Sequence, residues 1–315
     1  MKKRISLLIV ILGLLIQIGF GQDYTFRVLA NNGQNKFKVS GNKWAVAKTG
    51  TKLNEGDKLK ISTDGYLGLV HVSGKTLELT EAGTYEVSQL SENIGSSSKS
   101  IVSKYADFVI SKMSPEVIEE NRKKYASVTG SGERSIFNSD ILLYLPKTTF
   151  LFNNEAVIRW RYSEENPTYI ITFKDISGEQ ILKDESNVPF YKVNFNDSQF
   201  ANVMVSNLFI VHITLKENEK VESQKVLIKL LDESENSQII SEVEELQNSL
   251  GSESALNSLI MADYFEAHDL PLDAISQYER AINTSPSVEY FTEAYDEYLI
   301  RNVVKYFGLS EKEEK

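Results

Sequence analysis

The chain has 315 residues, no cysteine and a formal net charge of -10. Without cysteine it can form no disulfide, hold no thiolate nucleophile and carry no lipid attached through a cysteine. The acidic balance disfavours nucleic acid and anionic lipid as partners, since both require a basic surface. Hydrophobic residues at 41% and charged residues at 25% are typical of folded globular modules.

The first 21 residues have the pattern of a secretory signal peptide. Three basic residues at 2–4 precede an apolar run at 5–20, and Gly19 and Gly21 flank Phe20 in a small-x-small cleavage pattern. A retained anchor is the alternative, but this apolar run is shorter than the ~20 residues that span a bilayer. We therefore expect an exported chain that starts at Gln22 and has no membrane span after cleavage. The periplasm is the expected compartment, with the cell surface or secretion as alternatives.

Residues 22–92 are predicted to form a small β domain of short strands separated by turns. Two successive residues point to opposite sides of a strand, and such alternation is present from Thr25 to Ala30 and from Phe37 to Val39. Glycine-containing turns follow at 31–33, 40–42, 54–57, 64–65, 73–74 and 82–83. This regular spacing favours a small sandwich or barrel.

Part of this domain is similar to a known family. The segments LNEGDKL at 53–59, ISTDGYLGL at 61–69 and SGKTLEL at 73–79 resemble the periplasmic β domain of FecR-type proteins. The resemblance covers about residues 46–87 and consists of turns and strands, without a catalytic signature. It implies a periplasmic sensing or scaffold domain. A β module that only supports its neighbours is the alternative.

Residues 93–136 are predicted to be a linker that contains two short helices. The stretch 94–100 has the Ser-rich composition of a flexible linker. Apolar residues at 101, 105, 108, 109 and 113 then recur at helical spacing, and Ser114 followed by Pro115 starts a second helix. Gly130 and Gly132 could suggest a phosphate-binding loop, but the strand pattern after them favours a connecting loop.

Residues 137–233 are predicted to form an immunoglobulin-like β sandwich. Roughly six or seven strand patterns follow one another without a long helix between them. Trp160 alternates with Ile158 and Tyr162 along one strand, so we expect its side chain in the sandwich core. The alternative is a platform for carbohydrate stacking, which would require further exposed aromatic side chains on the same face.

Residues 234–310 are predicted to be helical, and 311–315 to be a charged tail. Within this region the spacing A-x2-F followed by A-x3-Y-x2-A-x4-P resembles a single tetratricopeptide repeat, carried by Ala262, Phe265, Ala274, Tyr278, Ala281 and Pro286. Alanines let paired helices cross closely, and Pro286 ends the second helix. One repeat cannot bury its apolar faces alone, so neighbouring helices or the sandwich must cover them. The expected fold class is thus multidomain β plus α: a small FecR-like β domain, an immunoglobulin-like sandwich and C-terminal TPR-like helical hairpins.

The tetratricopeptide resemblance implies a partner-binding face. In that family the first helix of each pair lines a concave surface that binds extended peptides. On this sequence the exposed concave positions would be Asn257, Asp263 and Glu266, with Glu293 and Glu297 on the next helix. Their acidic character suggests that the partner, an envelope protein or peptide, presents a basic segment. A solvated helix face is the alternative.

The sequence carries no recognised catalytic or cofactor-binding pattern. His71, His212 and His268 fall in three different predicted modules, so no clustered metal ligands are expected. Nucleophile-elbow, Walker and dinucleotide-binding motifs are absent from it.

We therefore predict a non-enzymatic exported envelope scaffold or adaptor without cofactor or metal. It would bind a protein partner through its C-terminal helical region. The alternative is a carbohydrate-binding or cell-surface recognition protein that uses Trp44, Trp160 and nearby tyrosines of the β modules.

Overall fold

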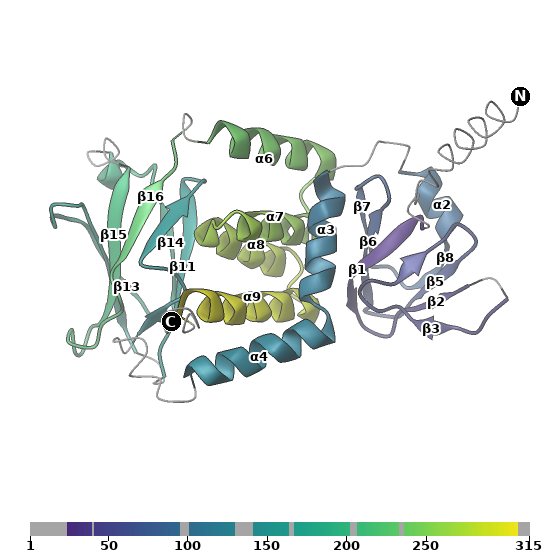
Figure 1. The fold of residues 1–315 in the computed structure, drawn as a ribbon, viewed down its shortest axis with the longest axis horizontal. Helices are drawn as coiled ribbons and strands as arrows, with labels where there is room; N and C mark the ends of the chain where they lie inside the picture. The colour runs from purple at the N-terminus through teal and green to yellow at the C-terminus, as the bar shows by residue number, and fades with distance from the viewer. Residues whose placement is uncertain are drawn as a thin grey trace, which may run out of the picture.

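The computed structural model describes residues 24–39, 41–94, 101–129, 141–163, 167–201, 207–232 and 236–307. Two β modules lie at opposite ends of the molecule, and helices lie between them (Figure 1). The fold is thus mixed β plus α, with β-sheets followed by C-terminal helices. The predicted signal peptide at 1–21, the loop with Gly130 and Gly132 and the tail at 311–315 lie outside the described residues. Across the described ranges, no helix has the length and apolar character needed to cross a membrane.

The N-terminal β module consists of two four-stranded sheets, with strand orders β4-β1-β6-β7 and β3-β2-β5-β8. The elements are β1 (Phe26–Asn32), β2 (Lys36–Lys38), β3 (Ala45–Val46), β4 (Lys52–Leu53), β5 (Lys58–Ile61), β6 (Tyr66–His71), β7 (Thr76–Leu79), β8 (Gly83–Glu86) and the short helix α2 (Val87–Glu92). Between the sheets lies a core of the module's own, which includes Phe26, Val28, Leu59 and Leu69. Phe26 and Val28, which the alternation in the sequence sets on one side of β1, both lie in this core.

A bulge in β1 modifies that alternation. The pairing of β1 with β6 shifts register between Val28 and Ala30. Phe26 and Val28 belong to the core of the module, whereas Leu29 and Ala30 belong to a second core that includes the helices. Both sides of β1 are therefore buried, and its second side is the surface on which the helices pack.

The second β module is built from a five-stranded and a three-stranded sheet, with orders β10-β16-β15-β12-β13 and β14-β11-β9. Its elements are β9 (Leu142–Leu143), β10 (Thr148–Leu151), β11 (Glu155–Arg161), β12 (Tyr169–Lys174), β13 (Gln180–Ser186), β14 (Phe190–Asn194), the 3-10 turn η1 (Ser198–Phe200), β15 (Leu208–Leu215) and β16 (Val226–Leu230). Most described strand pairs are antiparallel, but β10 pairs with β16 in parallel. Trp160 is 1% exposed and contacts the ring edge of Tyr169, which confirms its predicted place in the core.

The helices between the β modules are α3 (Ile101–Lys112), α4 (Pro115–Thr129), α6 (Ser237–Leu250), α7 (Ala255–Ala267), α8 (Pro271–Thr284) and α9 (Glu289–Phe307). Their ends follow sequence signals. Gly251 ends α6 in a positive-φ conformation, the Ser254 side chain accepts a hydrogen bond from the N–H of Asn257, and Pro271 occupies the first turn of α8. Ala262, Ala274 and Ala281 are fully buried or nearly so, as expected for the closely crossing pair α7 and α8.

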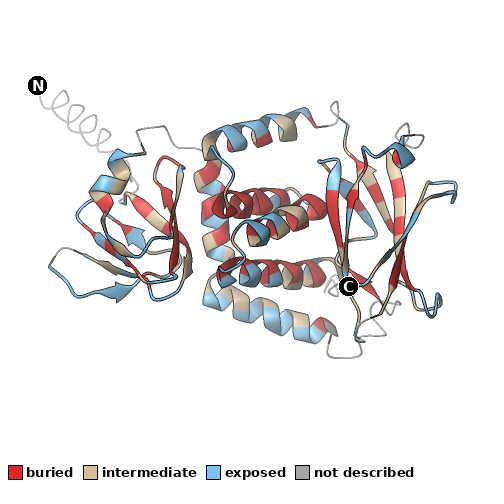
Figure 2. Ribbon diagram, turned by 180° about the vertical axis from the view of Figure 1, so that it is seen from behind, coloured by how far each residue is buried: buried red, intermediate tan, exposed pale blue. Residues whose placement is uncertain are grey.

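Helices α3 and α4, predicted as parts of a linker, pack in the same layer as the C-terminal helices. Helix α3 contacts α6 and α7, and α4 runs along α9 (Figure 1). Val102, Tyr105 and Ala106 of α3 are completely buried. Figure 2 shows buried residues on the central helices and in the sheets on both sides of them. A single apolar cluster accordingly runs from Tyr66 in the N-terminal module through α7 to Ile158 in the second module.

A buried carboxylate joins the helices to the second β module. Asp273, in the first turn of α8, is completely buried. Its Oδ2 accepts the backbone N–H of Phe152 at 2.8 Å, and its Oδ1 accepts the backbone and side-chain N–H groups of Asn153 at 2.9 and 2.6 Å. Burial raises the pKa of Asp273 to about 7, although these donors oppose the rise. The turn after β10 is thereby fixed to the start of α8.

We expect Asp273→Ala to destabilise the protein by roughly 2 to 4 kcal/mol, because three N–H donors would lose their acceptor inside the protein. Urea unfolding of the full chain measures this change. The matched control is Glu289→Ala, which removes an exposed carboxylate from the first turn of α9 and should change stability by less than about 0.5 kcal/mol. Equal effects of the two substitutions would contradict the anchoring role.

The raised pKa of Asp273 also predicts a pH dependence of stability. The folded chain holds the proton of this carboxyl more tightly than the unfolded chain, whose pKa is near the ordinary 3.8. The stabilisation from protonation is therefore complete below about pH 4 and is lost as the pH rises towards about 7. Between about pH 5 and 8, the unfolding free energy of the native chain should fall relative to that of Asp273→Asn. A constant difference would mean that Asp273 stays ionised throughout this range.

Candidate functional site

The five residues expected on an exposed acidic face lie on α7 and α9, but the structure does not place them on one open surface. Asn257, Asp263 and Glu297 are buried, with exposures of 7%, 0% and 2%. Glu266 is half-buried, and Glu293 alone of the five is exposed. The expectation of an exposed concave face is therefore wrong for four of the five positions.

Asn257 contacts the N-terminal β module. Its Oδ1 accepts the hydroxyl of Thr76 on β7 at 2.6 Å. Its Nδ2 donates to the carbonyl oxygens of Ser252 at 2.6 Å and Leu250 at 3.2 Å. One residue earlier, the N–H of Leu256 donates to Glu78 at 2.9 Å. The start of α7 thus connects the helices to β7. The side-chain amide of Asn257 forms its hydrogen bonds with groups inside the protein.

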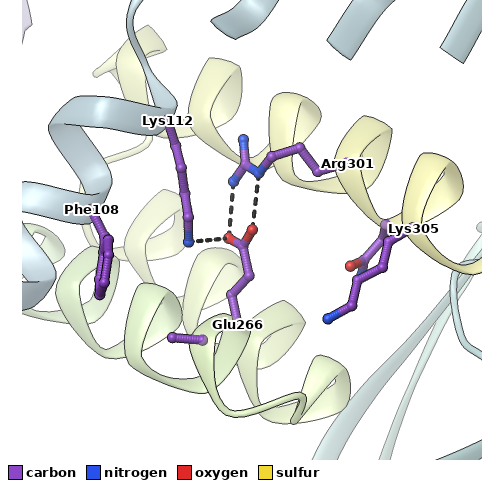
Figure 3. A pocket seen from close by; sticks show the side chains of 7 residues that line it. Phe108, Lys112, Glu266, Arg301 and Lys305 are labelled. Carbon is purple, nitrogen blue, oxygen red and sulfur yellow. Dashed lines mark hydrogen bonds and ion pairs between the residues drawn. The ribbon is translucent and has the colours of Figure 1, made fainter. Parts of the chain in front are cut away.

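Asp263 and Glu266 are part of an ion cluster formed by three helices. Figure 3 shows Glu266 between Lys112 and Arg301. Lys112 at the end of α3 places its Nζ 2.6 Å from Asp263 and 3.3 Å from Glu266. From α9, the Nε and Nη2 atoms of Arg301 each donate to a different oxygen of Glu266 at 2.9 Å. This two-pronged contact is the geometry in which a guanidinium binds a carboxylate most strongly.

Burial and ion pairing act in opposite directions on the two carboxylates. Burial raises the pKa of Asp263 to about 6, although Lys112 opposes the rise. Burial would also raise the pKa of Glu266, but Arg301 and Lys112 together hold that pKa below its usual value. Glu266 is therefore ionised at neutral pH, and its charge is balanced within the cluster.

Glu297 has a corresponding partner on α4. Its Oε1 accepts a hydrogen bond from the Nε of Arg122 at 2.7 Å, and the Nη2 of Arg122 lies 2.5 Å from the same oxygen. The acidic residues of α7 and α9 do attract basic residues, as their charge predicts. Those basic residues belong to the same chain. Lys112 on α3 and Arg122 on α4 lie 151 and 175 positions from Asp263 and Glu297, and Arg301 on α9 binds Glu266. The sequence pattern could not show this pairing, because α3 and α4 are predicted as parts of a linker.

A hollow of about 300 Å³ lies beside the ion cluster, between α3, α7 and α9 (Figure 3). It is lined by Phe108, Lys112, Glu266, Ala267, Arg301, Asn302 and Lys305. Its charged side chains are paired: Lys112 and Arg301 with Glu266, and Lys305 with Asp269. The lining itself carries three cations against the one carboxylate of Glu266. Asp263 and Asp269, next to the hollow, supply two further negative charges through their pairs with Lys112 and Lys305, so the hollow and its immediate neighbours together have no net charge.

A larger groove of about 610 Å³ lies between α4 and α9. Its lining combines apolar and charged side chains: Met113, Pro115, Ile118, Glu119, Arg122, Lys123, Ala126, Glu293 and Glu297. Ile118 is half-buried, so the apolar part of the groove is accessible from solvent. Glu293 and Glu297 are the two predicted partner-binding residues that line it. The sequence does not predict the half of the groove formed by α4, because the segment that begins at Pro115 is expected only as a short helix within a linker.

The histidines occupy separate structural environments. The His71 Nδ1 lies 2.8 Å from the Ser73 hydroxyl, and burial lowers the pKa of His71. His268 stacks on Tyr264 at 4.1 Å between ring centroids and lies 3.2 Å from Glu242. Among the described residues, no three His, Asp or Glu side chains gather as a potential metal site.

The two tryptophans differ in what they can contact. Trp160 is enclosed in the second β module at 1% exposure and cannot stack on a ligand. Trp44 is 39% exposed at the start of β3. Of the two tryptophans considered for carbohydrate stacking, only Trp44 is accessible.

No protein-family model matches this chain, and a search of curated proteins finds no significantly similar sequence. The similarities to FecR-type domains and to a tetratricopeptide repeat therefore stay predictions from residue patterns.

The ion cluster leads to a stability prediction. Arg301→Met should destabilise the protein by roughly 2 to 4 kcal/mol, because Glu266 would keep its charge in a largely buried place without its main partner. Lys305→Met, one turn further along α9, removes only an exposed contact to Asp269 and should change stability by less than about 0.5 kcal/mol. Thermal or urea unfolding of both variants provides the comparison. A small loss for Arg301→Met would show that the cluster contributes little.

Proposed function

We propose that the protein is an exported, non-enzymatic scaffold or adaptor of the cell envelope. In this proposal the helices hold two β modules at a fixed separation, and the protein partner binds beside the helices. The observation that supports the proposal best is the continuous apolar core that joins both β modules through α7, α8 and α9. Separate modules on flexible linkers would each close their own core and leave their relative position open.

Polar contacts strengthen the connection at both ends of the helical layer. On the N-terminal side, Asn257 and the N–H of Leu256 bind β7, and the Tyr66 ring contacts the ring of Phe291 at 5.5 Å. On the other side, Arg159 on β11 forms an ion pair of 2.6 Å with Glu279. The N–H of Val157 donates to the hydroxyl of Ser276 on α8 at 3.0 Å. Such contacts support a spacer role, since they specify orientation as well as distance.

The family resemblances fit into this proposal as follows. The module β1–β8 would be the FecR-like domain, the five- and three-stranded sheets an immunoglobulin-like sandwich, and α7 with α8 a TPR-like pair capped by α9. The side of α7 that would bind a peptide in a tetratricopeptide protein is covered by α3, whose Lys112 forms ion pairs with Asp263 and Glu266. We therefore assign the partner, an envelope protein or peptide, to the groove between α4 and α9.

Carbohydrate recognition through the β modules is the second candidate function. Trp160 cannot contribute to it, because its side chain is enclosed in the second β module. It keeps Trp44, which is exposed on the N-terminal module.

The spacer role is tested by a distance measurement. Because the chain has no cysteine, the exposed positions Val39 and Val188 can be changed to cysteine and spin-labelled, one in each β module. Pulsed electron paramagnetic resonance should give one narrow distance distribution. The pair Ile176→Cys with Val188→Cys, both within the second module, sets the width expected of a rigid body. A distribution several times broader between the modules would contradict the scaffold proposal.

The assignment of the partner to the α4–α9 groove is tested separately. A photo-crosslinking amino acid in place of Ile118 should yield a discrete crosslinked protein in the envelope fraction of cells that express the full chain. The same group at Lys192, exposed on β14, is the control and should not yield that product. The same product from both positions, or none from Ile118, would refute this location of the binding site.

A further inference from the structure

Four lysines share the outer face of the sheet β3-β2-β5-β8. Lys36 and Lys38 lie on β2, and Lys58 and Lys60 lie on β5. Phe37 and Leu59, which alternate with these lysines, pack in the module core. Since successive side chains of a strand point to opposite faces, all four lysines point outwards. We call this surface, together with Trp44 and Val46, the lysine face.

The strand register sets like charges directly opposite each other. Lys36 pairs with Lys60, and Lys38 with Lys58, across β2 and β5. Like charges at directly opposed positions destabilise a sheet. Lys58 forms an ion pair with Glu86 on β8 at 2.7 Å. Among the residues that the structure describes, no carboxylate lies within 4.0 Å of the amino groups of Lys36, Lys38 or Lys60.

This concentration of positive charge departs from the rest of the chain. Residues 24–94 contain nine Lys and Arg against seven Asp and Glu, whereas the whole chain has a net charge of -10. The lysine face is also distant from the acidic helices, because the β2–β3 hairpin points away from them (Figure 1). At physiological ionic strength charges act over about 8 Å, so the field at this face is set by its own lysines. An anionic ligand would be attracted there.

Exposed apolar side chains border the lysines. Val46 on β3 pairs with Lys36, and Ala45 with Phe37. Continued by one residue, the same register sets Trp44 opposite Lys38. Trp44 and Val46 are 39% and 47% exposed, and Val39 in the same hairpin is 42% exposed. Figure 2 shows much of this hairpin as exposed at the end of the molecule. An aromatic ring next to amino groups offers both a stacking surface and counter-charges to one ligand.

We propose that the lysine face binds an anionic polysaccharide, a sugar polymer that carries carboxylate or phosphate groups. The exposed Trp44 ring fits the apolar face of a sugar ring, and the lysine amino groups fit its anionic substituents. Lysines act as flexible point charges, which suits anionic groups that are spread along a polymer. An acidic polypeptide would use the same charges but would have no particular need of Trp44. This proposal stands independently of the scaffold role and of the α4–α9 groove.

The test uses the full mature chain and polygalacturonate, a carboxylated sugar polymer, with binding measured by titration at low salt. We expect binding to polygalacturonate but not to neutral dextran, and a loss of affinity as salt is raised. The double substitution Lys36→Gln with Lys60→Gln should weaken binding by about threefold to thirtyfold. Trp44→Ala should weaken it as well. The matched control, Lys192→Gln with Lys220→Gln, removes the same charge from exposed positions of the second β module and should leave binding unchanged.

Other outcomes would overturn the proposal. Equal losses of affinity in the two double lysine substitutions would mean that binding depends on the overall charge of the chain and not on the lysine face. Tighter binding of poly-L-glutamate than of polygalacturonate, or no effect of Trp44→Ala, would assign the face to acidic polypeptides. The thermal midpoint of Lys36→Gln with Lys60→Gln should equal or exceed that of the native chain, because a like-charge pair is removed. A marked drop would show that these lysines stabilise the fold itself, and the premise would be wrong.

Discussion

The structure depends on the burial of helix α7. Every residue from Ala255 to Phe265 is buried, so the helix has no side that faces water until its last two residues, Glu266 and Ala267. A helix of this kind must be surrounded, and α3, α6, α8 and β7 surround it. Its polar residues must then find partners inside the protein, as Asn257 does with Thr76 and Asp263 with Lys112. The position of the N-terminal β module and the place of α3 both follow from this requirement.

Charge is distributed differently at the centre and at the N-terminal end of the molecule. At the centre, acidic residues of α7 and α9 are neutralised by Lys112, Arg301 and Arg122. Ion pairs of this kind contribute less to stability than their geometry suggests, but breaking one of them leaves an unpaired charge. They therefore fix which helix packs where. At the N-terminal end, lysines face lysines, and among the described residues only Lys58 of the four has a carboxylate partner, Glu86. That arrangement favours a ligand from outside the chain.

The acidic residues of the helices illustrate how a correct physical argument can lead to a wrong location. Their charge predicts a basic partner, and each of Asp263, Glu266 and Glu297 has one. The partners lie within the chain, because α3 and α4 fold back onto α7 and α9 with Lys112 and Arg122, and because α9 brings Arg301 to Glu266. In the groove between α4 and α9, Ile118 contributes apolar surface and Glu293 remains exposed, which is why we propose this groove for the partner.

Local features of the fold follow from the sequence alone. Gly251 and Ser254 mark the boundary between α6 and α7, Ser114 and Pro115 mark the start of α4, and the alternation around Trp160 gives its burial. These features depend on neighbouring residues, through backbone conformation, caps and side-chain period. The tertiary structure alone decided that α3 covers α7, that a bulge gives β1 a second buried side and that Asp273 binds the turn after β10. The contact of Lys112 on α3 with Asp263 on α7 and that of Asp273 with Phe152 join residues more than a hundred positions apart. No local pattern specifies which distant surfaces will meet.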